Sequence, residues 1–364
     1  GDTLFPADTV VKQKTLSRDK AEREVPLYRV GASFGPLVGM ASDGKDVYSL
    51  HRNKLVRTRF VGGLPIQDEM PVDSATAGPV IRDGQIWIAS REGMVTYDAV
   101  KFEKKVAVNI RESNSSASKI YTDMAYCGKL SKTGNDSFAY VSDDGSVFTS
   151  RGAKKLDGKS GERFRIACTD MDRDGASEII AVGSRGTVAA INFDEGKDFL
   201  KALWTKSYKR GAAGTSGLKD ETSGIAIGDI NNDGYPEVVF LGDNLVYALD
   251  RSGLPVAGFP VKISRGSPVF GFFSDPVIVD VTGDDVPEIL VPSSDGLVYA
   301  VNGKGKLLTD GFPMAAGSFE YIVYTGTAAA GNITGIIQKT RFTGKFVNPN
   351  YCTQDRRRSQ TIMQ

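Results

Sequence analysis

The sequence predicts an all-β protein, and in particular a β-propeller with seven blades of four-stranded antiparallel sheet. Short runs of β-forming residues alternate with Asp-Gly, Glu-Gly, Arg-Gly and Asn-Gly dipeptides, which is the pattern of successive hairpins. Long stretches of the chain also align with one another, which indicates a structural repeat. Helical periodicity is scarce, and even the best candidate, residues 11–24, has no clear apolar stripe.

The repeat is clearest in the second half of the chain. Three units align there: CTDMDRDGASEIIAVGSRGTVAAIN from Cys168 to Asn192, IGDINNDGYPEVVFLGDNLVYALD from Ile227 to Asp250, and IVDVTGDDVPEILVPSSDGLVYAVN from Ile278 to Asn302. More degenerate units cover Gly35–Phe60, Gly78–Val106 and Ile120–Leu156, and a faint one covers Tyr321–Phe346. The sequence therefore contains six clear repeats and a weak seventh.

The size of the repeat favours a propeller over other β architectures. One four-stranded sheet cannot bury both of its faces alone, whereas radial packing of several sheets buries them and leaves only short edges. Roughly 320 residues over seven blades gives about 45 residues each, within the usual range of a blade. A pair of β-sandwiches is the main rival, but it would not predict the repeat.

These units divide the chain into three parts. We expect an N-terminal segment at residues 1–25, the propeller at 26–346 and a polar tail at 347–364. Closure of the ring calls for a strand from the N-terminal end to complete the last blade, and Leu4–Lys12 is the candidate.

Composition excludes several classes of function. The 364 residues include 45 Lys and Arg against 44 Asp and Glu, so the basic excess of a nucleic-acid or membrane-surface protein is missing. No apolar run is long enough to span a membrane, and the N-terminus lacks the apolar core of a signal peptide. The lone histidine, His51, argues against multi-histidine metal sites, and we expect an ordinary strand or surface residue there.

Three acidic loops carry the chemistry of the sequence. Oxygen-bearing side chains stand at positions one, three, five and nine of each loop: Asp170, Asp172, Asp174 and Glu178 in the first, Asp229, Asn231, Asp233 and Glu237 in the second, and Asp280, Thr282, Asp284 and Glu288 in the third. Alternation lets a curled backbone aim several oxygens at one centre, and glycine at position six of the first two loops permits the sharp turn. A hard cation fits such a set, calcium better than magnesium.

β-Forming residues follow each loop, so it lies between strands and is not an EF-hand. The pattern resembles the FG-GAP or VCBS repeats of integrin-α-like propellers, over roughly Phe164 to Ala316. The resemblance implies that each loop joins the first two strands of a blade and binds calcium in a mainly structural role, at up to three sites. It also implies a backbone carbonyl ligand at position seven, which is Ala176, Tyr235 or Val286.

The three sites are not expected to be equal. The first loop has four carboxylates, the second replaces one with Asn231, and the third has Thr282 and also Asp285 in place of the glycine. We therefore expect calcium affinity to fall from the first loop to the third. The alternative is that these are acidic turns that bind no metal.

Cysteine usage is thin. Cys127 and Cys168 fall at comparable positions of adjacent units, where they can form a disulfide or remain buried thiols. Cys352 lies in the polar tail, and no CxxC pair occurs, which argues against a structural zinc site.

The sequence supports a non-catalytic, calcium-binding propeller that serves as an extracellular, cell-surface or periplasmic adhesion module for a protein or glycan partner. One alternative is a calcium-dependent, polysaccharide-active enzyme of the lyase kind. Another is a structural spacer domain of a larger surface protein. The sequence leaves the partner and the oligomeric state open.

Overall fold

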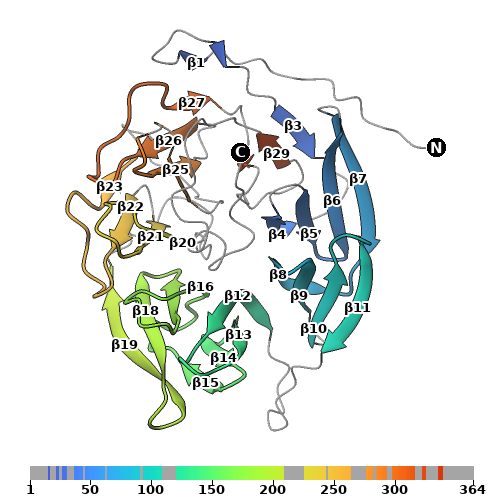
Figure 1. The fold of residues 1–364 in the computed structure, drawn as a ribbon, viewed down its shortest axis with the longest axis vertical. Helices are drawn as coiled ribbons and strands as arrows, with labels where there is room; N and C mark the ends of the chain where they lie inside the picture. The colour runs from blue at the N-terminus through green and yellow to red at the C-terminus, as the bar shows by residue number, and fades with distance from the viewer. Residues whose placement is uncertain are drawn as a thin grey trace.

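The structure of the protein is a computed structural model. It describes residues 15–16, 22–23, 27–30, 37–43, 46–61, 64–90, 93–108, 120–208, 225–242, 245–263, 276–280, 282, 284–292, 297–315, 322–324 and 335–338. This part of the chain consists of strands, turns and bends without a helix, arranged as a ring of sheets (Figure 1). The all-β class and the β-propeller predicted from the sequence are confirmed.

Six sheets each contain four antiparallel strands in chain order, with the first strand near the centre of the ring and the fourth at the rim (Figure 1). Blade 1 contains β4 (Leu37–Ser42), β5 (Val47–His51), β6 (Lys54–Val61) and β7 (Leu64–Pro71). Blade 2 contains β8 (Ala75–Arg82), β9 (Gln85–Ser90), β10 (Gly93–Asp98) and β11 (Glu103–Val108). Blade 3 contains β12 (Tyr121–Lys129), β13 (Asp136–Ser142), β14 (Ser146–Thr149) and β15 (Gly152–Lys155).

The next three blades contain the aligned repeats. Blade 4 contains β16 (Phe164–Thr169), β17 (Glu178–Gly183), β18 (Thr187–Asp194) and β19 (Phe199–Ser207). Blade 5 contains β20 (Ile225–Gly228), β21 (Glu237–Gly242), β22 (Leu245–Leu249) and β23 (Val261–Lys262). Blade 6 contains β24 (Val277–Val279), β25 (Glu288–Pro292), β26 (Leu297–Val301) and β27 (Met314–Ala315).

A three-stranded sheet, the closing sheet, joins the two ends of the chain. β3 (Leu27–Val30) pairs antiparallel with β29 (Gly335–Gln338), which pairs in parallel with β28 (Ile322–Tyr324). An N-terminal strand thus completes a C-terminal sheet, but this strand is Leu27–Val30, inside the segment assigned to the propeller. The candidate Leu4–Lys12 and the tail at 347–364 lie outside the described residues. β1 (Thr15–Leu16) and β2 (Glu22–Arg23) form a separate two-stranded sheet.

Turn chemistry explains the hairpins. Between β13 and β14, Gly145 has φ 79° and its N–H donates to the Ser142 carbonyl at 2.9 Å, while the Asp144 carboxylate accepts the Ser146 N–H at 3.0 Å. An Asp-Gly pair supplies both features, since Asp bonds its own turn and Gly adopts positive φ without strain.

The core lies between blades, where the apolar face of one sheet packs on the next. Blades 3 and 4 share one buried cluster, which includes Ala125, Val141, Ile166 and Ile179. Similar clusters join blades 1 and 2, 2 and 3, 4 and 5, and 5 and 6. Blades 2 to 5 are therefore each packed against a neighbour on both faces, as the repeat size predicted. Among the described residues there is no helix with the length and hydropathy of a membrane span.

Candidate metal centre

The three acidic loops occupy the same place in three successive blades. Each joins the first strand of its blade to the second: β16 to β17, β20 to β21 and β24 to β25. The glutamate at position nine is the first residue of the second strand in every case, namely Glu178, Glu237 or Glu288. The structure therefore places these loops in the connection that the sequence predicted.

Hydrogen bonds to its own carboxylates close the first loop. Asp170 accepts the backbone N–H groups of Asp174 at 3.0 Å and Gly175 at 2.9 Å. Asp174 accepts the Ala176 N–H at 2.8 Å, and Glu178 accepts the Met171 N–H at 2.8 Å from the buried side. In the described part of the chain, Asp170, Asp172 and Asp174 are the group of carboxylates whose oxygens all lie within 4.8 Å of one another.

The second loop repeats this pattern at the equivalent atoms. Asp229 accepts the N–H groups of Asp233 at 3.1 Å and Gly234 at 2.8 Å, and Asp233 accepts the Tyr235 N–H at 2.8 Å. Glu237 accepts the Ile230 N–H at 2.9 Å. Two loops of different sequence therefore curl their oxygens inward in the same way.

Positive φ angles make the curl possible. In the first loop Arg173 has φ 62° and Gly175 has φ 93°, and in the second Asn232 has φ 60° and Gly234 has φ 92°. Glycine adopts these values without a Cβ clash, which explains its place at position six.

The third loop keeps its turn although it lacks this glycine. Asp285 takes φ 65°, and its N–H donates to Asp280 at 3.0 Å, as the glycine does in the other loops. Asp is one of the few residues that visit the left-handed region readily. The Thr282 hydroxyl lies 3.5 Å from both the Asp280 and the Glu288 carboxylate, at the outer limit of a hydrogen bond.

Burial and like charge act together on the position-nine glutamates. The Glu178 side chain is buried beside Asp172 and Asp170, and desolvation followed by these charges raises its pKa to about 8. Desolvation with Asp233 and Asp229 likewise raises the pKa of Glu237 to about 8, and burial raises the pKa of Asp170. A divalent cation would favour the ionised forms of these groups, because it replaces like-charge repulsion with attraction.

The same connection in blade 3 is built without this acidic pattern. Its loop runs from 129 to 137, and its positions one, three, five and nine are Lys129, Ser131, Thr133 and Ser137. Lys129 is the last residue of β12 and Ser137 already lies in β13, so six residues, 130–135, connect these strands, whereas eight, 170–177, connect β16 to β17. A shorter connection between the first two strands of a blade can therefore be built without acidic residues.

Contacts between neighbouring loops were not predicted by the sequence. The Lys132 ammonium lies 3.4 Å from the Asp174 carboxylate, and the Ser177 N–H donates to the Lys129 carbonyl at 2.7 Å. Farther along, the Arg173 guanidinium lies 5.6 Å from the centre of the Tyr235 ring. The signal in the sequence is a cation at position four of one loop, but only the fold shows that it reaches the next.

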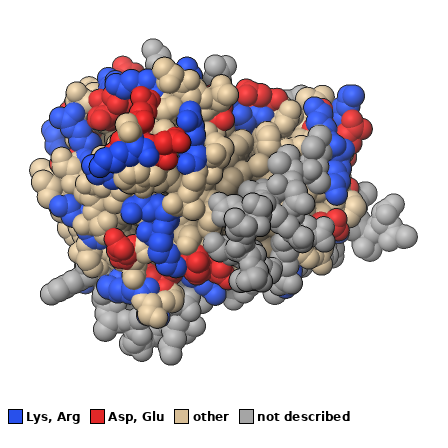
Figure 2. All heavy atoms as spheres, turned by 90° about the horizontal axis from the view of Figure 1, so that it is seen from below, with Lys and Arg blue, Asp and Glu red and all other residues tan. Residues whose placement is uncertain are grey.

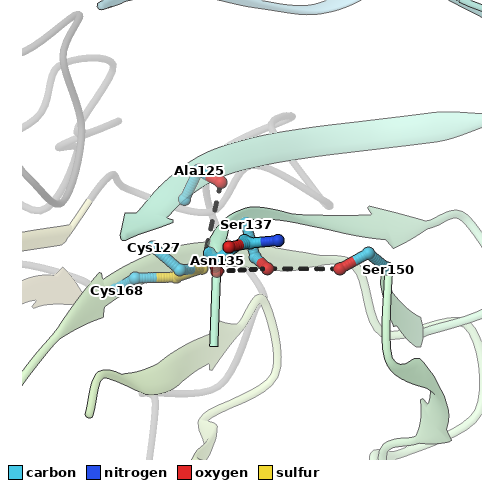
Figure 3. The surroundings of a disulfide bond; sticks show 6 residues. All are labelled: Ala125, Cys127, Asn135, Ser137, Ser150 and Cys168. Atoms are coloured by element: carbon cyan, nitrogen blue, oxygen red, sulfur yellow. Dashed lines mark hydrogen bonds between the residues drawn. A yellow bond between two sulfur atoms is a disulfide. The ribbon is translucent and has the colours of Figure 1, made fainter. Parts of the chain in front are cut away.

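A disulfide ties blade 3 to blade 4. Cys127 on β12 and Cys168 on β16 are bonded, with both side chains fully buried (Figure 3). The sequence left this pairing open, because comparable positions in two repeats do not show which side chains meet. Cys352 lies outside the described residues.

The other candidate residues have ordinary surroundings. His51 is buried at the end of β5, where it pairs with Lys54 of β6 in the sheet. Acidic and basic side chains are intermixed over the face seen from below (Figure 2).

The residues present in the loops fit calcium. The first loop offers four carboxylates and the carbonyl of Ala176, the second three carboxylates with the Asn231 amide, and the third three with the Thr282 hydroxyl. Calcium takes six to eight oxygen ligands in flexible geometry, and water completes such a set. The glutamate counted among these carboxylates is buried in each loop, at most 4% exposed.

Comparisons with known proteins bear on the fold. A scan of protein-family models found no match, and a search of curated proteins also found none. The crystal structure of BBS1N in complex with ARL6DN, soaked with mercury, is similar with a TM-score of 0.51 and 13% identity, over 77% of this chain and 82% of that chain. The lead-soaked crystal of that complex gives a TM-score of 0.50 and 13% identity, over 78% and 83%.

A functionally unknown protein from Desulfotomaculum acetoxidans DSM 771 gives a TM-score of 0.49 and 11% identity, over 77% of this chain and 86% of that chain. The two BBS1N structures are β-propellers. At such low identity the likeness concerns architecture alone. Together with the ring of four-stranded sheets, it shows that the chain is a β-propeller.

Proposed function

We propose that this protein is a calcium-binding β-propeller with repeats of the FG-GAP or VCBS kind. Calcium ions brace three loops on one face, and the propeller acts as a non-catalytic, extracellular or cell-surface module that binds a protein or glycan partner. The observation that carries the proposal is the shared hydrogen-bond pattern of the first two loops, each with a buried glutamate behind three oxygen-bearing side chains.

A bracing role suits the way the oxygens are arranged. Asp170 and Glu178 point into their own loop and bind its backbone. An ion at this centre would complete the loop, which leaves few ligand positions for a substrate. The shorter connection in blade 3, residues 130–135, contains no acidic residue, whereas the longer acidic loops offer carboxylates to an ion as well as to their own backbone.

An extracellular setting is supported by two features. The Cys127–Cys168 disulfide is of the kind that persists in oxidising compartments. Calcium is abundant there, which suits sites of moderate affinity.

The architecture supports a binding role. The propeller presents turns and loops on its two faces, and such segments are free to specialise without disturbing the blades. BBS1N, which has the same fold, was crystallised with a protein, ARL6DN. We propose that this chain also uses its loops to hold a macromolecular partner.

Thermal unfolding of the full chain tests calcium binding. Addition of calcium after treatment with a chelator should raise the melting temperature, because an ion bound only by the folded state stabilises it, by about 2.7 kcal/mol per site at one hundred times Kd. The variant with Asp172→Asn and Asp174→Asn removes two charges while keeping an oxygen at each position, and its response should be smaller. Asp83→Asn is the control, because it neutralises a carboxylate in the turn between β8 and β9, outside the acidic loops. A melting temperature that calcium leaves unchanged would overturn the proposal.

A binding assay tests the role of the module. The full chain, immobilised with calcium, should retain a cell-surface protein or a glycan from an array, and a chelator should reduce this binding. Chain breakage of an acidic polysaccharide, with new unsaturated ends, would instead support the enzyme alternative. If the chelator leaves the retention unchanged, partner binding does not depend on the calcium ions.

A further inference from the structure

Arg173 connects the first acidic loop to the second. It stands at position four of the first loop, between Asp172 and Asp174, and its guanidinium lies 5.6 Å from the centre of the Tyr235 ring in the next blade. Its Nη1 atom also lies 3.7 Å from the place where a Cβ on Gly234 would be. The contact therefore reaches positions six and seven of the second loop.

These two positions close the second loop. The Gly234 N–H donates to Asp229 at 2.8 Å, and the Tyr235 N–H donates to Asp233 at 2.8 Å. The Tyr235 carbonyl is also the expected ligand at position seven. A side chain that holds the Tyr235 ring thus restrains the backbone that shapes the second site.

The first loop in turn restrains the backbone that carries the Arg173 side chain. Arg173 has φ 62°, and the next N–H, that of Asp174, is held by Asp170 at 3.0 Å and Asp172 at 3.2 Å. Because Asp170, Asp172 and Asp174 are the proposed ligands of the first ion, binding there would restrain the backbone on both sides of Arg173.

We propose that Arg173 is a positioning residue that couples the two calcium loops, so that an ion in one raises the affinity of the other. This inference rests on the proposed calcium binding. The coupling is positive because the conformational entropy of ordering the shared contact is lost only once when both sites fill. By thermodynamic linkage it is also reciprocal, so each ion raises the affinity of the other site by the same factor. An exposed cation–π contact sets its size at about two- to fivefold in affinity.

A second guanidinium offers a matched control for charge. Arg251, in the turn between β22 and β23, lies 4.2 Å from the centre of the same Tyr235 ring. It belongs to the same blade as the second loop, so it contacts the ring without linking it to the first loop. Arg173→Met and Arg251→Met each remove one positive charge and one cation–π contact, but only the first breaks the link.

The experiment uses the full chain and terbium as the probe. Tb³⁺ takes the oxygen ligands of calcium and is excited through a nearby tyrosine, so Tyr235 reports on the second loop, whereas the first has Ala176 at that position. Terbium affinity of the second loop is measured with the first loop intact and with Asp172→Asn and Asp174→Asn together. The pair of measurements is repeated with Arg173→Met, Arg173→Lys and Arg251→Met, and calcium competition confirms the site.

We expect disabling the first loop to weaken the second about two- to fivefold in the wild type and with Arg251→Met, and by no more than experimental error with Arg173→Met. Arg173→Lys, which keeps a cation over the ring, should restore part of the effect. The same weakening with and without Arg173 would overturn the coupling, and would leave calcium binding in place. Absence of any terbium or calcium binding at the second loop would instead overturn the proposed function.

Discussion

Glu178 and Glu237 are each buried behind the oxygens of their own loop. Each accepts one backbone N–H, from Met171 or Ile230, and burial with nearby carboxylates raises the pKa of both to about 8, from an ordinary 4.5. A carboxyl group with a raised pKa favours the folded state while protonated and opposes it once ionised. Calcium binding and a change of pH therefore both act on the ionisation of these two glutamates.

The pH dependence of stability, measured in the presence of a chelator, tests the raised pKa values of Glu178 and Glu237. The stabilisation from each protonated glutamate is complete below the unfolded pKa of 4.5 and is lost as the pH rises through about 8. We expect the free energy of unfolding to fall between about pH 4.5 and pH 8, by up to about 1.4 kcal/mol per pH unit for each glutamate. Calcium should remove this slope, because it binds the ionised form.

The variant Glu178→Gln with Glu237→Gln is the control, since an amide oxygen can still accept the same N–H groups without titrating. Its stability in chelator should vary less with pH than that of the wild type. Equal slopes for the two proteins would contradict the assignment of the titration to these glutamates.

At the scale of the elements, each loop is held by its neighbours as well as by its own residues. The turn after β26 packs under the second loop, where a Cβ on Gly303 would lie 1.7 Å from the Ile230 carbonyl oxygen. The Cys127–Cys168 bond joins the first strands of two blades. The position and curl of an acidic loop therefore depend on the blades beside it.

Gly303→Ala tests the packing beneath the second loop. The clash is with backbone, which cannot rotate away, so we expect destabilisation of about 1–3 kcal/mol and weaker ion binding at that loop. Chemical denaturation measures the first effect and calcium titration the second. Gly196→Ala is the matched control, because its Cβ would meet nothing closer than the Asp194 carboxylate at 3.5 Å. An alanine at 303 that behaves like the control would contradict this packing.

Removal of the disulfide tests the tie between blades 3 and 4. The two cysteines are 41 residues apart, and a crosslink over that span stabilises by about 4 kcal/mol in the chain-entropy view. Cys127→Ala with Cys168→Ala should lower the melting temperature, and a digest of the unreduced wild type should contain one crosslinked peptide with both residues. Free thiols at both positions in unreduced protein would contradict the structure.

At the scale of the whole molecule, the sequence predicted the blades themselves better than the side-chain contacts between neighbouring blades. Periodic hairpins and repeats predict blades, because strand patterns and turn residues are local properties. Contacts such as Arg173 with Tyr235, or Cys127 with Cys168, join residues of different blades, and their geometry exists only once the ring forms. The pairing of β3 with β29 likewise joins segments far apart in the sequence, and local patterns did not single out Leu27–Val30 for it.

The ring shows a recurring contact that no single repeat reveals. At four successive joins an arginine of one blade lies over an aromatic ring of the next: Arg57 over Phe102, Arg82 over Tyr126, Arg151 over Phe193 and Arg173 over Tyr235. Such contacts contribute about 0.5–1 kcal/mol each when exposed. The last of them alone connects two acidic loops, which is why it is assigned a role beyond packing.

A calorimetric titration of the full chain with calcium, after removal of bound ions, tests the central claim most directly. The account predicts saturable binding of up to three ions, with the tightest at the first loop, since four carboxylates gather there. Asp172→Asn with Asp174→Asn should abolish that tightest step and leave the weaker ones. A titration without binding, or a tightest step that survives these substitutions, would contradict the account.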